Sequence, residues 1–205
     1  TDARIKFSIS EGAGGPFSIP AGLAFDHHRG LLFVSYNNCH QVQAFSCDDG
    51  GSSVFKFSEG GDQPGQLFNP LGIAIDHDHD RILVADYGND RVQSWSLSDQ
   101  SFLSCIGHRG SGDLKFNSSR DVAVDKHHRR IIIADAGNNR LVFLSSIDLS
   151  FLFSVGARRG KQPGEFSGPS KIAIDDDRHR IIVTDTGNHR VQVLSSIDGS
   201  FLFEF

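Results

Sequence analysis

The sequence predicts an all-β chain, a β-propeller with four complete four-stranded antiparallel blades. First, a short apolar run ending in aspartate recurs every 49 or 50 residues, at Asp26, Asp76, Asp125 and Asp175. Repetition at such a period indicates a repeat architecture. Second, each unit contains four runs of about four to six residues rich in Ile, Val, Leu and Phe, which is strand length. No stretch shows helical periodicity, and four short strands per repeat are typical of a propeller blade.

The strands can be placed in order within each unit. We expect them at residues 72–75, 81–85, 91–95 and 101–106 of the second unit, and at 171–174, 180–184, 190–194 and 200–205 of the fourth. Gly, Asn, Asp, Ser and His gather between these runs, which is the composition of turns. The first run is small and suits the crowded innermost position. The last run is rich in phenylalanine and suits the wider outer gap between blades.

A second recurring element has the pattern Asp-x-Gly-Asn-x-Arg and occupies residues 86–91, 135–140 and 185–190. We expect its Gly-Asn step to supply the positive φ angles of a tight turn. The aspartate and arginine flank the turn and are placed to pair across it or to bond its amides. Near-identity in three units predicts a structural role for Asp86, Asn89, Arg91, Asp135, Asn138, Arg140, Asp185, Asn188 and Arg190.

With these motifs the chain resembles the NHL repeat, from Phe17 to Phe205. The match is nearly letter for letter over residues 69–76, 86–93 and 187–193. The resemblance implies a β-propeller but leaves the function open, because one fold serves many functions. The first unit departs from the pattern and is interpreted as a drifted repeat, with a functional site at its rebuilt turn as the alternative. It has Tyr36, Asn38, Cys39 and Gln41 in place of the motif's Asp, Gly, Asn and Arg.

We assign the chain to a single propeller domain or fragment of one, with blades at residues 17–67, 68–115, 116–165 and 166–205. Residues 1–16 are expected to hold the outer strand (4–10) and exit loop of a preceding blade. The chain contains no Met and ends inside a strand at Phe205. We therefore expect a part of a longer protein, within the six-bladed ring common among NHL-type proteins. Self-association or a closed four-bladed ring are the alternatives.

The charge, the hydropathy and the cysteine content of the chain indicate which partners and which compartment to expect. The net charge is −5, and only residues 116–165, with eight basic and five acidic side chains, are net positive. No run approaches membrane-spanning length, so no membrane partner is expected. Three cysteines without metal-ligand spacing indicate a reducing compartment, and we expect a cytoplasmic protein.

The links between blades are the most variable segments: residues 60–66, 107–115 and 156–165. They are expected to share a face with the Asp-x-Gly-Asn-x-Arg turns, and loops on a rigid scaffold commonly bind partners. Their cations are candidate contacts for phosphates or acidic side chains. These binding candidates are Arg109, Arg158, Arg159 and Lys161.

Seven of the ten histidines fall in the turns after the first strand of each unit: His27, His28, His77, His79, His127, His128 and His179. Imidazole and carboxylate groups are common ligands of divalent metal ions, so these turns are candidates for a metal site. We expect the side chains of adjacent histidines to point apart, and the innermost strands hold no ligands. We therefore predict no metal, no cofactor and no catalytic residues.

The function expected from these observations is non-catalytic: a recognition or scaffold module whose loop face binds a protein partner. The resemblance implies that such a propeller often sits in a larger protein, such as a ubiquitin ligase. One alternative is an RNA-binding propeller centred on the third unit, disfavoured by the acidic chain and by aromatics confined to strands. The other is a metal-dependent lyase or lactonase.

Overall fold

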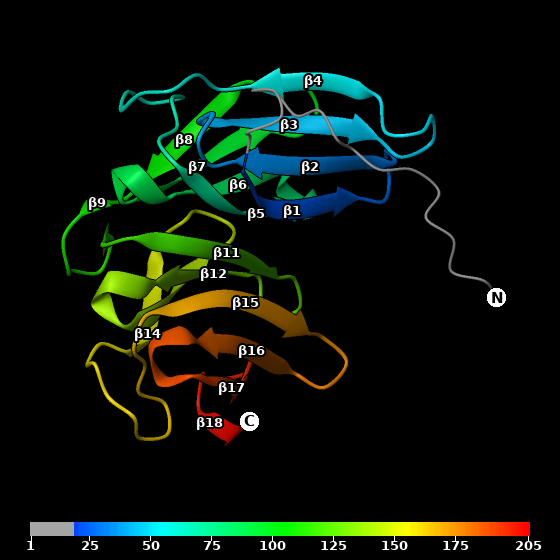
Figure 1. The fold of residues 1–205 in the computed structure, drawn as a ribbon. Coiled ribbons are helices and arrows are strands. Elements are labelled where there is room, and N and C mark those ends of the chain that lie inside the picture. The colour runs from blue at the N-terminus through cyan, green and yellow to red at the C-terminus, as the bar shows by residue number, and fades with distance from the viewer. Residues whose placement is uncertain (1–18) are drawn as a thin grey trace.

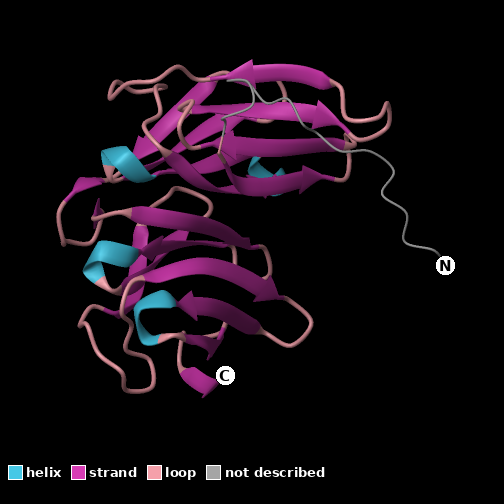
Figure 2. Ribbon diagram, viewed as in Figure 1, coloured by secondary structure: helices cyan, strands magenta, loops and turns pink. Residues whose placement is uncertain are grey.

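The computed structural model of the chain describes residues 19–205, which form four four-stranded antiparallel sheets (Figures 1 and 2). Within each sheet the strand order follows the sequence, so every blade is a meander. The predicted all-β propeller with antiparallel four-stranded blades is confirmed. The strand and exit loop expected within residues 1–16 lie outside the described residues.

The first two blades are built from eight strands. The first contains β1 (Pro20–Asp26), β2 (Leu31–Tyr36), β3 (Gln41–Ser46) and β4 (Ser53–Phe57). The second contains β5 (Pro70–Asp76), β6 (Arg81–Asp86), β7 (Arg91–Ser96) and β8 (Phe102–Ile106).

The last two blades repeat this plan. The third contains β11 (Ser119–Asp125), β12 (Arg130–Asp135), β13 (Arg140–Ser145) and β14 (Phe151–Gly156). The fourth contains β15 (Pro169–Asp175), β16 (Arg180–Asp185), β17 (Arg190–Ser195) and β18 (Phe201–Glu204).

The remaining elements are short. A parallel pair, β9 (His108–Arg109) and β10 (Lys115–Phe116), closes the link between the second and third blades. Helical segments among the described residues are single 3-10 turns: η1 (His77–His79), η2 (Tyr87–Asn89), η3 (Ala136–Asn138) and η4 (Thr186–Asn188). The expectation that no helix of note occurs is confirmed for this part of the chain.

Side-chain alternation along each innermost strand divides the apolar residues between two seams. Ile73 of β5 packs in the core between the first and second blades, whereas its neighbour Ala74 packs toward the third blade. Each link between blades also adds a buried apolar side chain to the seam. Phe116 is fully buried between the second and third blades, and Phe166 between the third and fourth. As expected, the phenylalanines of the outer strands fill the gaps between blades, and the ring of Phe153 stacks on that of Phe143.

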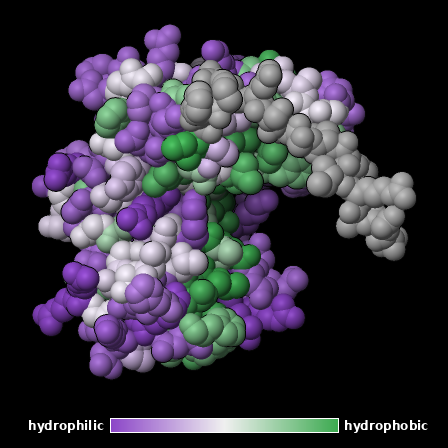
Figure 3. All heavy atoms as spheres, viewed as in Figure 1, coloured by the Kyte–Doolittle hydropathy of each residue, from purple (hydrophilic) through white to green (hydrophobic). Residues whose placement is uncertain are grey.

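The end faces of the blade series are more exposed than its internal seams. Leu23 is 66 % exposed, although the equivalent Ile73 is 6 % exposed against its preceding blade. At the other end, Phe205 is 77 % exposed. Blades one and four face each other across a central hollow lined with hydrophobic side chains (Figure 3), and residues of β1 and β15 line it together.

Candidate functional site

The Asp-x-Gly-Asn-x-Arg motif forms a buried hydrogen-bond network. In the third blade, Asp135 is fully buried at the end of β12. Its Oδ1 accepts a hydrogen bond from the Asn117 amide at 2.7 Å. Its Oδ2 accepts bonds from Arg140 Nε and Asn138 Nδ2, both at 2.8 Å. The aspartate therefore pairs with the arginine across the turn, while its other oxygen holds the incoming link.

The remaining donors of this network clamp the link itself. Arg140 Nη2 donates to the carbonyl oxygens of Gly112 and Lys115 at 2.7 and 2.8 Å. Asn138 Nδ2 donates to the carbonyl oxygen of Gly110 at 2.7 Å. The same contacts recur in the other two matched blades, at Asp86, Asn89, Arg91, Asp185, Asn188 and Arg190. The motif thus fixes the variable loops on a rigid base.

The expected role of the motif glycine is wrong. Gly88, Gly137 and Gly187 do not have positive φ; the left-handed residue is the one after the asparagine, for example Asn139 at φ 53°. The glycine is needed for close approach instead. A Cβ on Gly137 would lie 2.5 Å from Asn117 Cγ, because the turn packs directly on the incoming link.

In the first three blades, the left-handed residue of the turn connects its blade to the next. Asp90 Oδ1 accepts from the Ser118 amide at 2.6 Å, and Asn139 Oδ1 accepts from the Gly168 amide at 3.1 Å. In the divergent first blade, His40 at φ 57° accepts from the Asn69 amide through Nδ1 at 3.1 Å. The drifted turn therefore keeps this connection although its Asp and Arg are replaced.

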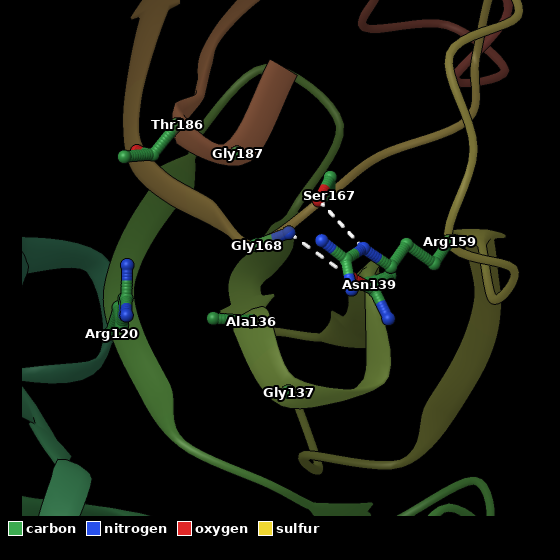
Figure 4. A pocket seen from close by; sticks show the side chains of 9 residues that line it. All are labelled: Arg120, Ala136, Gly137, Asn139, Arg159, Ser167, Gly168, Thr186 and Gly187. Carbon is green, nitrogen blue, oxygen red and sulfur yellow. Dashed lines mark hydrogen bonds between the residues drawn. The ribbon is translucent and has the colours of Figure 1, made fainter. Parts of the chain in front are cut away.

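A hollow of about 390 Å³ opens on the loop face, between the third and fourth blades (Figure 4). Arg120 and Arg159 flank it from opposite sides. Arg159 Nε donates to Ser167 Oγ at 3.1 Å, which holds the guanidinium at the rim. The floor is made by the small residues Ala136 and Gly137, which leave room for a ligand group.

Two neighbouring hollows extend this surface. One, of about 420 Å³, is lined by Arg159 and Lys161; the other, of about 340 Å³, is lined by Arg120, Lys171 and Tyr87. None of the residues that line these three hollows is an aspartate or glutamate. We call this surface, defined by Arg120, Arg159, Lys161 and Lys171, the cationic loop face.

The structure divides the four cations singled out in the sequence. Arg159 and Lys161 line the hollows. Arg158 lines none of the three, and Arg109 projects with 84 % of its side chain exposed, 4.0 Å from Asp90.

Sequence reasoning missed Arg120 and Lys171 on the innermost strands. The second blade has Leu71 and Gly72 at these two repeat positions. The departure of Arg120 and Lys171 from the repeat is therefore the sequence signal by which they could have been found.

One carboxylate lies deeper, in the central hollow below Lys171. Asp121 is 7 % exposed, and its Oδ2 accepts from the Ile172 amide at 2.9 Å. Burial raises the pKa of Asp121, although Lys171 Nζ at 3.6 Å opposes that rise. The expectation that innermost strands hold no ligand-type side chain therefore fails at this position.

The expectation that the histidine turns diverge is also wrong. Two groups of three imidazoles converge on the opposite face, each combining turns of neighbouring blades: His27, His28 and His77, and His127, His128 and His179. Burial lowers the pKa of His77, and the nearby His28, Lys126 and His27 lower it further against the opposing effect of Asp26. The sequence could not show this, because the contact depends on how successive blades are offset.

The fold and the repeated turn define this protein as a β-propeller of NHL-type blades. The NHL repeat profile matches residues 69–94 and 166–194, and the chain belongs to the NHL-repeat β-propeller family. No curated protein matches the chain. Within residues 19–205, no helix is long and apolar enough to cross a membrane.

A similar fold occurs in the solved structure titled Kuenenia stuttgartiensis hydrazine synthase. The alignment has a TM-score of 0.69 at 12 % sequence identity and covers 90 % of this chain and 48 % of that one. The chain thus spans about half the length of this structural relative. At such identity the likeness shows the fold alone.

Proposed function

We propose that this propeller is a non-catalytic recognition module whose cationic loop face binds an acidic segment of a protein partner. One observation carries the proposal: cations converge on hollows that no carboxylate lines, in a chain of net charge −5. Among the described residues, Arg120, Arg159 and Lys161 form no ion pair. Their charges are therefore available to an anionic ligand.

The arrangement suits an extended ligand better than a compact one. The cations are spread over three adjoining hollows, so several carboxylates along one chain would each meet a partner. Arg120 and Arg159 also offer planar guanidinium groups, which bind carboxylates through two parallel hydrogen bonds. We place the module in the cytoplasm as part of a larger protein, for which a ubiquitin ligase is the favoured context.

RNA is the second candidate, and a specific observation favours it. Tyr87 lines the same hollow as Arg120 and Lys171, and Phe68 in the adjacent link is 44 % exposed. Such rings can stack on unpaired bases beside cations that bind phosphate. The expectation that aromatics are confined to strands therefore fails here. A metal-dependent lyase or lactonase is the least favoured alternative. Such an enzyme needs several metal ligands in the central hollow, and Asp121 is the one carboxylate among the described residues that line it.

The test compares two double variants with the same change in net charge. Arg159→Glu with Lys161→Glu reverses two cations of the hollows, whereas Arg109→Glu with Arg158→Glu reverses two cations outside them. Binding of a fluorescein-labelled decaglutamate peptide is followed by anisotropy. The proposal expects at least a tenfold loss for the first variant and less than a threefold loss for the second. Equal losses would contradict it.

An RNA arm separates the two candidates. The same titration uses a labelled single-stranded RNA of mixed sequence at physiological salt. Weak, sequence-independent binding supports the protein partner. Nanomolar, sequence-selective binding would overturn the proposal and put RNA first.

A further inference from the structure

The turns on the face opposite the loops hold two histidine triads at equivalent places in the propeller. The first triad is His27, His28 and His77; the second is His127, His128 and His179. Each joins the adjacent histidine pair of one blade to a single histidine of the next. In each triad, one nitrogen from every ring lies within 4.8 Å of the others.

The second triad has the geometry closer to metal coordination. Its ring centroids are 4.9, 4.8 and 5.9 Å apart, and the planes are inclined to one another by 53° to 73°. Three imidazoles bound tetrahedrally to one ion at metal–nitrogen distances of 2.0–2.1 Å have centroids about 5 Å apart. Small rotations about the side-chain bonds would therefore bring these three nitrogens to one ion.

The first triad is arranged differently. His28 and His77 are stacked with their planes only 14° apart and their centroids 4.5 Å apart. Rings stacked in parallel direct their nitrogen lone pairs side by side rather than at a common point.

A hydrogen bond between an imidazole and a buried carboxylate further distinguishes the second triad. His128 Nδ1 lies 2.9 Å from Oδ2 of Asp125, which is 1 % exposed. A proton on Nδ1 donated to this carboxylate leaves the Nε2 lone pair for a metal, and such a partner also makes the ligand more basic. The equivalent Asp26 is instead bonded by Arg29 Nη1 at 3.0 Å, and it lies 3.8 Å from His77 Nε2, beyond hydrogen-bond distance.

We propose that His127, His128 and His179 form a three-imidazole site for a divalent transition-metal ion such as zinc. The ion bridges the third and fourth blades, and its fourth coordination position is open to water or to a ligand atom from outside. Because the ligands come from two blades, binding holds the seam between them together. A ligand that binds the folded state alone raises the melting temperature.

The test uses the 205-residue chain without a polyhistidine tag, stripped with a chelator and titrated with zinc sulfate by calorimetry. Cobalt(II) serves as a spectroscopic probe, because tetrahedral coordination gives intense visible bands. His179 has φ 53°, so His179→Asn keeps a residue suited to the left-handed turn. His127→Gln removes a second ligand, and His27→Gln is the matched control in the first triad.

We expect one zinc equivalent per chain, a higher melting temperature with zinc, and tetrahedral cobalt bands. His179→Asn and His127→Gln should each weaken zinc binding at least tenfold and abolish the cobalt bands, while His27→Gln leaves both unchanged. Three outcomes would overturn the proposal: no stoichiometric zinc, octahedral cobalt only, or binding that is lost in His27→Gln and kept in His179→Asn.

Discussion

Arg140 and Asp135 form an almost completely buried ion pair, with Arg140 Nε 2.8 Å from Asp135 Oδ2. The same guanidinium donates through Nη2 to two carbonyl oxygens of the link that precedes its blade. One pair therefore closes the turn between two strands and anchors a surface loop. This double attachment explains why the motif recurs while the loops that it holds vary.

Arg140→Ala should lower the free energy of unfolding by about 3 kcal/mol, because it leaves Asp135 buried without its charged partner. Urea denaturation followed by circular dichroism measures the change. Arg109→Ala removes an arginine with 84 % of its side chain exposed and should stay within about 0.5 kcal/mol of the parent. Equal effects of the two substitutions would show that the pair adds nothing.

Gly137→Ala should destabilise the chain by about 1–3 kcal/mol, because the new methyl group would overlap Asn117 and push the link away from the turn. Gly112→Ala is the matched control in the same link. Its Cβ would meet nothing closer than 3.5 Å and its φ is not positive. A neutral effect of Gly137→Ala would mean that the link has room to move.

Asp121→Asn should make the chain more stable at pH 7. Burial raises the folded-state pKa of Asp121 above its unfolded value of about 3.9, so the folded state binds this proton more tightly. The contribution to stability is then fully present below the unfolded pKa and is lost as the pH rises through the folded pKa.

The gain of the Asn variant should therefore shrink toward zero near pH 3–4, as measured by urea midpoints across this range. Asp113→Asn, at an exposed link position, should show no such trend. A variant that is less stable than the parent at pH 7 would contradict the burial argument.

Any binding of single-stranded nucleic acid should show a shallow salt dependence. Lys171 already lies 3.6 Å from Asp121, which leaves about three cations of the loop face for phosphates. Three contacts predict a slope of about −2 for log affinity against log salt concentration. Anisotropy titrations between 50 mM and 200 mM salt measure this slope. A much steeper value would indicate a larger phosphate-binding surface.

The sequence predicts the fold well because each blade repeats the same local pattern. The run that ends at Asp76 and the motif at residues 86–91 indicate where strands β5 and β6 end. The role of Gly137 was not predictable, since composition shows that a glycine is present but not which neighbour approaches it. A positive φ angle and a close approach of another segment can both require glycine, so the sequence alone does not distinguish these two roles.

The proposed binding surface is only half predictable from the sequence. Arg159 and Lys161 lie in a visibly basic link, whereas Arg120 occupies a strand position whose orientation toward the hollow emerges only from the assembled blades. The histidine triads are likewise formed only when the blades are assembled. His127 and His179 are 52 positions apart, and their contact requires the turn of one blade to reach the turn of the next.

The proposed division of roles is that the repeated motif holds the fold while the cationic loop face binds the partner. Arg140→Ala and Arg159→Ala test it directly when unfolding free energy and decaglutamate affinity are both measured for each variant, with binding recorded well below the melting temperature. We expect that Arg140→Ala loses stability but retains affinity within threefold, whereas Arg159→Ala keeps its stability and loses affinity at least fivefold. A normal melting curve with lost binding for Arg140→Ala, or unchanged binding for Arg159→Ala, would contradict it.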